Sequence, residues 1–403
     1  MANVSSSNGL EKRPKLRFPG FDEPYVLHRI GDIYAERSER GAADMELLSV
    51  TMNDGVMQRS EIEGKDNSSE DKSNYKVVRK GDMVYNSMRM WQGANGVSPY
   101  DGIVSPAYTV LTAKLPICND YFAALFKNYK LINEFRKNSQ GMTSDTWNLK
   151  YPQIETIKVY SPVIEEQEKI ASILVTLDKR IAAQAALVEQ LKKYKRGVIS
   201  ALLSSKTNPY YSPETWKEVA LCDVASGFEY GMNAAATVYD GSHKYIRITD
   251  IDDNSHLYSQ DVPVSPEGQV DEKYRVREND ILFARTGASV GKSYRYQRSD
   301  GDLYYAGFLI RIHVNSDVNC GYVFQNTLTE AYRRWVLLES ARSGQPGINA
   351  EQYKQYRFLL PPLELQNKIS TLATNLDNLI CKEENLLSQI EQVKIALLQR
   401  LFI

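Results

Sequence analysis

The sequence lacks long hydrophobic runs. No stretch approaches the roughly eighteen consecutive apolar residues that a membrane-spanning helix needs, and the chain begins with a polar segment. We therefore expect no membrane span, no secretory signal and a cytoplasmic protein. The composition is that of a folded chain, with 42% hydrophobic and 25% charged residues, and 403 residues suffice for two or three domains.

Cysteine, histidine and excess charge are also scarce. The four cysteines form no C-x-x-C pair and the four histidines are widely scattered, so no zinc-ligand spacing is present and we expect no metal. Lys plus Arg number 49 against 50 Asp plus Glu. Any affinity for nucleic acid must therefore come from local groups of basic residues and not from the overall charge.

An internal repeat is the most informative feature that is present. The segment Pro162–Ile170 returns as Pro361–Ile369, with the spacing of Pro, Glu, Gln and Ile preserved. Three further matches follow the same order along the chain at a similar offset, which a duplication explains better than chance. These matches pair Glu23–Ile33 with Glu214–Val224, Leu48–Thr51 with Ile246–Thr249, and Val78–Tyr85 with Val276–Phe283.

Each half runs from a turn-rich body into a helical segment. Short β-branched and aromatic runs bounded by Gly, Asn and Asp predict strands in the bodies, whereas 163–205 and 362–402 are rich in Leu, Ile, Gln, Lys and Glu and predict long helices. We expect an α+β fold with two similar domains separated by two long helices. The predicted segments are a first domain (1–161), a first spacer helix (162–206), a second domain (207–360) and a second spacer helix (361–403).

Both helices carry the same heptad seam, with eight of ten seam positions apolar in each and polar residues at matching places. A narrow seam of this length favours a coiled coil, although a helix packed on its own domain remains an alternative. Antiparallel pairing would give a rod of roughly 60 Å with the two bodies at opposite ends, related by an approximate two-fold axis. The predicted pairing residues are Leu177, Ile181, Gln184, Val188, Leu191, Lys195, Ile380, Glu383, Leu387, Ile390, Lys394 and Leu397.

Matching polar to polar residues predicts the register of this pair. Lys195 then faces Glu383, and Gln184 faces Lys394. A polar residue in a seam typically fixes register and orientation while it reduces stability. The same alignment opposes Leu177 to Leu401, Ile181 to Leu397, Val188 to Ile390 and Leu191 to Leu387.

Apparent catalytic and cofactor motifs do not hold. Gly287–Ser293 has three residues between its glycines where a phosphate-binding loop needs four, and 250–261 lacks the Gly and Glu of a calcium loop, so it is interpreted as a polar turn. Asn208–Tyr211 lacks the second Pro of an amino-methyltransferase motif. No nucleophile, base and orienting group can be assembled from scattered histidines. We expect a chain without catalytic residues.

The remaining signature is typical of DNA binding. Each body has two glycine-punctuated loops rich in Arg, Asn, Gln, Ser and aromatic residues, which are suited to base edges and phosphates. Solvated surface loops are the alternative for any individual residue. The predicted DNA-binding residues are Arg89, Trp91, Asn95, Ser98, Gln140, Thr143 and Ser144 in the first body, and Arg285, Thr286, Ser289, Lys292, Ser293, Arg342 and Gln345 in the second.

The order of these motifs resembles the specificity (DNA-recognition) subunit of type I restriction–modification enzymes. The resemblance covers nearly the whole chain and rests on Leu16–Phe21, Gly102–Tyr108, Asp280–Lys292 and the Pro-x-x-Glu-x-Gln-x-x-Ile starts of both helices. It implies two target-recognition domains that read the halves of a split site, with helices that set the gap. The loops at 87–100 and 285–298 differ, so the two half-sites should be unlike.

The resemblance also implies partners. Besides double-stranded DNA, these are two methyltransferase subunits and restriction subunits, and S-adenosylmethionine and ATP would then belong to those partners and not to this chain. Two alternatives stay open. A fused methyltransferase or nuclease would modify DNA by itself, whereas a coiled-coil scaffold would show no salt-dependent DNA binding.

Overall fold

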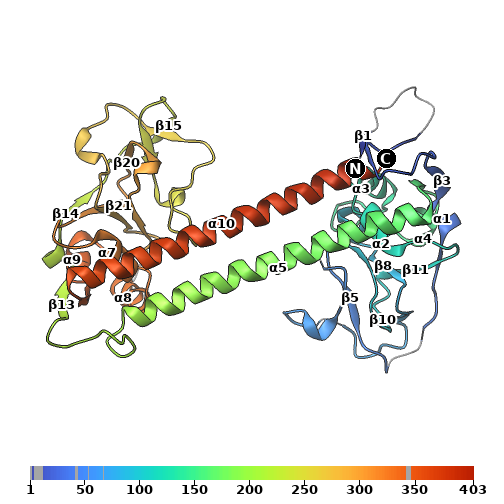
Figure 1. Cartoon of the computed structure of the whole chain (residues 1–403), viewed down its shortest axis with the longest axis horizontal. Coiled ribbons are helices and arrows are strands. Elements are labelled where there is room, and N and C mark those ends of the chain that lie inside the picture. Colours follow the sequence, from blue (N-terminus) through green and yellow to red (C-terminus); the bar gives the residue numbers. More distant parts are fainter. Residues whose placement is uncertain (1, 4–11, 41–43, 53, 67, 342–345) are drawn as a thin grey trace. The chain divides into compact units, whose positions relative to one another are not determined.

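The computed structural model describes residues 2–3, 12–40, 44–52, 54–66, 68–341 and 346–403. The chain divides into two compact units, one formed by Met1–Ala186 with Glu384–Ile403 and the other by Leu187–Glu383. Each unit contains one body and parts of both long helices (Figure 1). Within the described ranges, no helix has the length and hydrophobicity needed to cross a membrane.

The body of the first unit is built on a four-stranded antiparallel sheet in the order β4-β11-β8-β9. Short helices and two-stranded ladders surround this sheet. The strands of the body are β2 (Leu16–Arg17), which pairs with β1 (Ala2–Asn3), β3 (Val26–Arg29), β4 (Tyr34–Glu36), β5 (Leu48–Val50), β6 (Val56–Gln58), β7 (Lys76–Val78), β8 (Met83–Asn86), β9 (Asn95–Val97), β10 (Gly102–Val104), β11 (Tyr108–Ala113) and β12 (Lys158–Ser161); the helices are α1 (Ile30–Ile33), η1 (Arg59–Glu61), η2 (Met90–Gln92), α2 (Asn119–Leu125), α3 (Tyr129–Asn138) and α4 (Tyr151–Ile154).

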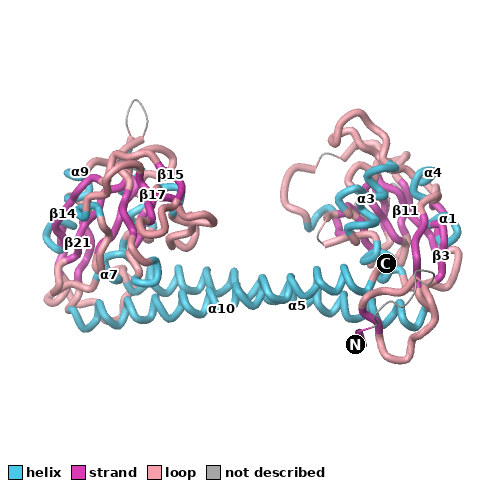
Figure 2. The backbone as a smooth tube through the Cα atoms, turned by 90° about the horizontal axis from the view of Figure 1, so that it is seen from above, coloured by secondary structure: helices cyan, strands magenta, loops and turns pink. Residues whose placement is uncertain are grey.

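The body of the second unit has the equivalent sheet order, β14-β21-β18-β19, and the same order of short α-helices, one before the sheet and three after it. Figure 2 shows the strands of each body enclosed by loops and short helices. The strands are β13 (Lys217–Ala220), β14 (Ala225–Tyr230), β15 (Ala236–Val238), β16 (Lys244–Ile246), β17 (Val264–Pro266), β18 (Asp280–Ala284), β19 (Ser293–Arg295), β20 (Leu303–Tyr305), β21 (Leu309–Val314) and β22 (Arg357–Leu360); the helices are α6 (Leu221–Val224), η3 (Ile248–Asp250), η4 (Glu272–Tyr274), η5 (Arg298–Asp300), α7 (Cys320–Asn326), α8 (Glu330–Ser340) and α9 (Ala350–Lys354).

The repeated Gln of the helix-start motif has a structural role in both units. The Gln167 side chain accepts a hydrogen bond from the Cys118 backbone N–H at 3.0 Å and donates to the Pro162 carbonyl at 2.9 Å. Gln366 makes the same two bonds, to the Asn319 N–H at 2.9 Å and the Pro361 carbonyl at 2.7 Å. Because each Gln satisfies a backbone donor at the start of α2 or α7, it fixes the long helix to the body beside it.

The long helices α5 (Ile164–Leu202) and α10 (Leu363–Leu401) lie close to their predicted bounds and run antiparallel (Figure 1). In the first unit, Ile170 near the start of α5 shares a core with Leu401 at the end of α10. In the second unit, Ile199 near the end of α5 shares a core with Ile369 near the start of α10. All twelve predicted pairing residues are buried or half-buried, as a seam requires.

The predicted polar partners in the seam are wrong. Lys195 forms its ion pair with Asp377 and not with Glu383, and Lys394 forms its ion pair with Asp178 and not with Gln184. Both aspartates are about half exposed, at 51% and 53%. The physical reason is the length of the lysine side chain, whose ammonium group reaches a carboxylate at the edge of the seam, so a polar residue need not face another polar residue.

At the end of α10, Leu401 belongs to the same core cluster as Ile170 and Leu174. Leu177, its predicted partner, is not part of that cluster. The three remaining predicted pairs, Ile181 with Leu397, Val188 with Ile390 and Leu191 with Leu387, stay predictions.

Candidate nucleic-acid interface

The predicted recognition loops begin with a hairpin of equal length in both bodies. Asn86 donates its backbone N–H to Ala94 at 3.0 Å, and Ala284 donates to Lys292 at 2.8 Å, so seven residues separate the paired positions in each hairpin. Gly93 and Gly291 close the hairpins with φ of 84° and 85°. This left-handed conformation favours glycine, which accounts for a glycine at the same place in both loops.

The second predicted loop joins the first at the end of the central strand. In the first body, Leu149 donates its N–H to the Ser87 carbonyl at 2.8 Å; in the second body, Ile348 donates to the Arg285 carbonyl at 2.9 Å. These bonds make Ser87 the counterpart of Arg285. The paired backbone places Arg89 two residues further into its hairpin than the position of Arg285.

In the first body the structure brings the two predicted loops together. The rings of Trp91 and Trp147 meet edge to face with centroids 5.2 Å apart, which stabilises the contact between the loops. Arg89 is exposed, and its guanidinium makes no hydrogen bond or ion pair within the part of the chain that the structure describes. Gln140, Thr143 and Ser144 of the second loop are exposed as well.

Two predicted DNA-binding residues of the first body point inward. Asn95 is fully buried opposite Tyr85 in the sheet, and its amide donates to the Gly93 carbonyl at 3.1 Å. Ser98 is also buried and donates to the Tyr100 carbonyl at 2.8 Å. Their prediction as DNA contacts is wrong for this conformation, because both lie at or beyond β9 where side chains return to the core.

In the second body Arg285 directly follows β18. Its Nε donates to the Gly307 carbonyl at 3.0 Å, and its guanidinium carbon lies 4.9 Å from the Tyr230 ring centre and 5.9 Å from that of Phe308. The neighbouring loop is held by a bond from the Gly287 N–H to the Pro346 carbonyl at 3.0 Å. Thr286 and Ser289 are half-buried in this loop, and Arg342 and Gln345 lie outside the described residues.

Two more predictions fail in the second body. The Lys292 side chain is only 10% exposed, and its ammonium group forms an ion pair with Asp253 at 2.5 Å and donates to the Ile251 carbonyl at 2.8 Å. Ser293 is fully buried and its hydroxyl lies 2.7 Å from that of Thr327. Both side chains serve internal hydrogen bonds, so neither can contact DNA in this conformation.

Three aromatic residues were missed by the sequence analysis. Trp147 lies in one of the predicted DNA-binding loops, but only polar residues of that loop were predicted as contacts. Tyr230 and Phe308 are 43% and 60% exposed beside Arg285, although they lie far apart in the sequence. Only the strand order β14-β21-β18 brings them together, so no local pattern could have identified them.

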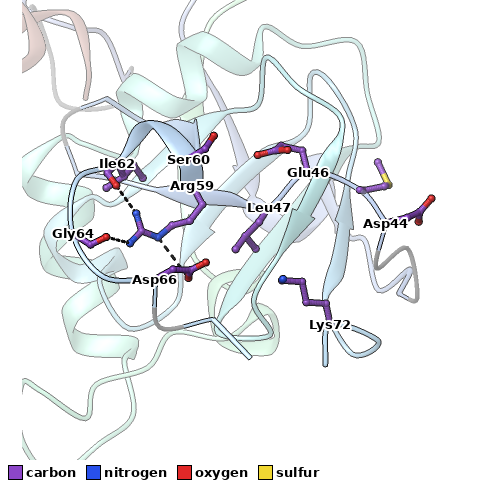
Figure 3. Close-up of a pocket in the computed structure, with 10 residues that line it drawn as sticks. Asp44, Glu46, Leu47, Arg59, Ser60, Ile62, Gly64, Asp66 and Lys72 are labelled. Carbon is purple, nitrogen blue, oxygen red and sulfur yellow. Dashed lines mark hydrogen bonds and ion pairs between the residues drawn. The ribbon is translucent and has the colours of Figure 1, made fainter. Parts of the chain in front are cut away.

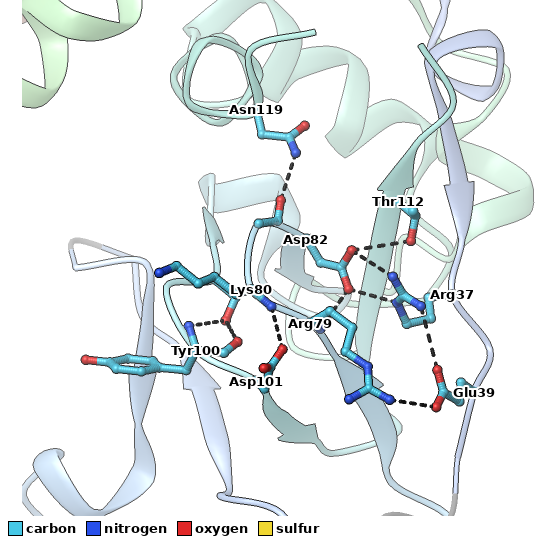
Figure 4. Close-up of polar contacts among 11 residues, drawn as sticks. Arg37, Glu39, Arg79, Lys80, Asp82, Tyr100, Asp101, Thr112 and Asn119 are labelled. Carbon is cyan, nitrogen blue, oxygen red and sulfur yellow. Dashed lines mark hydrogen bonds and ion pairs between the residues drawn. The ribbon is translucent and has the colours of Figure 1, made fainter. Parts of the chain in front are cut away.

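A buried carboxylate fixes the start of each central strand. Asp82 accepts bonds from the Arg79 N–H and the Arg37 Nε, both at 2.8 Å (Figure 4). Asp280 accepts the equivalent bond from the Arg277 N–H at 2.7 Å, but its other partner is His313 at 2.8 Å. Burial raises the pKa of Asp280 above its usual range, while the His313 bond and the nearby Arg311 oppose that shift.

A hollow of about 500 Å³ lies beside the first body's β5 and η1 (Figure 3). The Arg59 guanidinium is fully engaged there, because it donates to the carbonyls of Ile62 at 2.7 Å, Gly64 at 3.1 Å and Lys65 at 2.8 Å. Acidic residues also line the hollow, namely Asp44, Glu46 and Asp66. A phosphate would be repelled by these carboxylates, so the hollow is not part of the candidate interface. No cluster of His, Cys, Asp or Glu suited to a metal occurs among the described residues.

Comparison with known proteins gives a consistent result. The family model of the type I restriction modification DNA specificity domain matches residues 39–193 and again 213–392. The type I restriction enzyme StySPI specificity subunit of Salmonella potsdam is 23% identical over 303 residues, which cover 71% of this chain and 65% of that protein, just under two thirds. The MjaVIII specificity subunit of Methanocaldococcus jannaschii is 24% identical, with 79% of this chain and 77% of that protein covered.

Solved structures agree in fold. The S subunit of a type I restriction-modification system from M. genitalium superposes with a TM-score of 0.62 at 14% identity, covering 97% of this chain and 99% of that one. A chain from a study of complex assembly and conformational transition of the type I R-M system superposes with a TM-score of 0.57 at 14% identity, covering 96% and 99%.

Proposed function

Because the chain belongs to the type I restriction modification DNA specificity domain family and carries the family domain twice, we propose that it is the DNA-recognition subunit of a type I restriction–modification complex. Each body reads one half of a split target. The observation that carries this proposal is a common scaffold whose strand-end loops differ. Exposed Arg89 in one body and Arg285 in the other supply the side chains that read base edges and bind phosphates.

The two half-sites should be unlike. Ser87 and Arg285 occupy equivalent positions, and a small hydroxyl and a guanidinium cannot make the same contacts to a base pair. The hairpins that follow also differ, since Trp91 packs on Trp147 whereas the second hairpin is bonded to Pro346. An asymmetric target follows from these differences.

We further propose that the antiparallel pairing of α5 and α10 sets the gap between the half-sites. Each helix has 39 residues, and each unit pairs the two helices through an ion pair and a shared core. A paired helix bends less than a single one, so a change in helix length should change the accepted gap. Half-sites about one helical turn apart, roughly 34 Å, would present both major grooves on one face of the DNA.

The chemistry would belong to partner subunits. By this proposal the chain binds two methyltransferase subunits, and restriction subunits bind that assembly. S-adenosylmethionine and ATP are then bound by those subunits and not by this chain. The assembly would operate in the cytoplasm. Purified chain incubated alone with S-adenosylmethionine and DNA should transfer no methyl groups, and a measurable transfer would contradict the proposal.

The proposal is tested by mapping methylated adenines in DNA from cells that carry this chain with its methyltransferase subunits. The expected result is one asymmetric motif with two specified halves and an unspecified gap. Cells that carry the methyltransferase subunits alone provide the control and should lack the motif. A motif without a gap, or methylation that does not depend on this chain, would reject the proposed function.

A further inference from the structure

Arg285, Tyr230 and Phe308 form a single group at one edge of the second body's sheet. They lie at the adjoining ends of β18, β14 and β21, and the Arg285 N–H donates to the Phe308 carbonyl at 3.1 Å. The Tyr230 ring is held in place because its hydroxyl accepts a hydrogen bond from the Ala350 N–H at 3.2 Å. These backbone and side-chain bonds hold all three residues on rigid elements.

The guanidinium of Arg285 is held in a fixed orientation, but only one of its nitrogen atoms donates a hydrogen bond within the described part of the protein. Its Nε is bound to the Gly307 carbonyl at 3.0 Å, and two rings lie within cation–π distance. Neither Nη atom makes a hydrogen bond or ion pair with any residue that the structure describes. Neither is among the buried polar atoms without a partner, so both remain accessible to solvent. Two accessible donors on a fixed plane form the fork that binds two acceptors at once.

We propose that this group reads a guanine in the half-site of the second body. The O6 and N7 acceptors of guanine in the major groove match the arginine fork. Phe308, 60% exposed, and Tyr230, 43% exposed, present apolar surface beside it, which suits contact with bases and not with phosphates. The inference rests on the proposed function, because a base is read only if the second body binds DNA.

The first body has no such group at the equivalent place. Ser87 replaces Arg285, and its hydroxyl is buried against Thr109 at 2.9 Å. Ala107 takes the place of Phe308, because its carbonyl accepts a hydrogen bond from the Ser87 N–H at 3.1 Å, just as the Phe308 carbonyl accepts one from the Arg285 N–H. A guanine read in this way therefore belongs to one half-site only.

The test uses the full chain in cells with its methyltransferase subunits and compares motifs from mapped methylated adenines. We expect Arg285→Ala to accept other base pairs at one G·C position of one half-site, with discrimination there reduced about 10- to 100-fold. Arg285→Lys should behave similarly, because an ammonium group has no planar fork. Phe308→Ala should relax the same position more weakly. The Arg334→Ala variant, which removes a 74% exposed arginine of α8, is the matched control and should leave the motif unchanged.

The outcomes separate the inference from the proposed function. If the wild-type chain gives no split motif, the proposed function fails. If the motif is present but neither Arg285 variant changes any position, the guanine assignment fails. It also fails if Arg285→Lys keeps full activity while Arg285→Ala lowers methylation at all sites equally, and that result indicates a phosphate contact. The unaltered half-site and the melting temperature of each variant report whether the chain still folds.

Discussion

The first and second bodies share a scaffold but use different side chains at the same strand ends. Ser87 directly follows β8 and its hydroxyl points inward to Thr109, whereas Arg285 directly follows β18 and its guanidinium lies within cation–π distance of two partly exposed rings. The hairpin length, the left-handed glycine and the bond to the second loop are the same in both. The difference teaches that backbone hydrogen bonds are retained where the loops are anchored, while the side chains that face outward are free to change.

The buried carboxylates extend this comparison to the inside of the sheets. Asp82 is bonded to a guanidinium, that of Arg37, at two points of 2.8 and 3.1 Å. Asp280 has the imidazole of His313 instead, and that ring is 50% exposed. The same strand start is therefore held by a guanidinium in close contact in one body, and in the other by an imidazole together with the Arg311 guanidinium at 4.0 Å.

The largest effect is expected from the hairpin glycines. In Gly291→Ala the new Cβ would lie 2.6 Å from both methyl groups of Val336, whereas in Gly93→Ala the nearest atom is the Ile132 methyl at 3.4 Å. Both variants strain a left-handed residue by about 1–2 kcal/mol. Overpacking against Val336 should raise the loss of folding free energy in Gly291→Ala to about 3 kcal/mol or more. Hydrogen exchange, measured separately in each body, gives the two losses, and equal losses would contradict the packing difference.

A smaller effect is expected from the strand-start carboxylates. Asp82→Asn leaves the Arg37 guanidinium with only the half-exposed Glu39, 3.6 Å away, as a charged partner, and we expect the first body to lose about 2 kcal/mol of stability. Asp280→Asn removes a carboxylate whose pKa is already raised by burial, so the second body should lose less than about 1 kcal/mol. Local hydrogen-exchange stabilities of the two sheets check the order. A larger loss in the second body would mean that the imidazole is the stronger partner.

A pH difference between the bodies is expected from His256. Burial lowers the pKa of His256, whose Nδ1 lies 2.8 Å from the Ser293 carbonyl, and Lys292 and Arg333 lower it further. The unfolded chain binds a proton near pH 6.5 while the folded body does not, so the second body loses stability as the pH falls below that value.

The control for this prediction is His256→Asn. Asn tolerates the positive φ of 57° at this position and does not titrate. Stability of the second body is measured between about pH 7.5 and 5.5 in both proteins. The variant should show a flatter profile, and since the raised pKa of Asp280 acts in the opposite sense in both proteins, it does not affect the difference. Parallel profiles would remove His256 as the cause.

The smallest effect concerns the two seam ion pairs, which should be alike. Lys195 with Asp377 and Lys394 with Asp178 join half-buried lysines to half-exposed carboxylates. Double-mutant cycles that combine Lys→Met with Asp→Ala should give coupling energies of about 0.5 kcal/mol for each pair. A coupling above about 1.5 kcal/mol in one pair only would show that the seam is not equivalent along its length.

The duplication and the long helices could be predicted from the sequence because their signals are periodic and local. Repeated Pro, Glu and Gln mark the helix starts, and the heptad seam gives the buried face. The repeated Gln proved to be a structural anchor, which explains its recurrence. Register could not be predicted in this way, since the Lys195 ammonium reaches Asp377 outside the seam, while Leu401 lies in a core cluster with Ile170 and Leu174, with which the seam pattern does not pair it.

The candidate site was predicted only in outline. The structure brings the selected loops together, while their binding to DNA stays a prediction, but polar residues on the returning strand were assigned to the same surface. Asn95 and Ser293 occupy the same place opposite Tyr85 and Phe283, and both are buried. A polar residue in a glycine-rich stretch can point either way, and only the pairing of strands decides which side it takes.

The two seam ion pairs are reciprocal in sequence. Each joins a lysine from one copy of the repeat to an aspartate from the other, since Asp178 corresponds to Asp377 and Lys195 to Lys394. A mutation of a lysine or aspartate in one copy of the repeat therefore breaks an ion pair with the other copy, so these positions of the two helices are constrained together. The hairpins at 87–93 and 285–291 take no part in these pairs. A substitution in either hairpin therefore leaves the ion pairs that join the two helices unchanged.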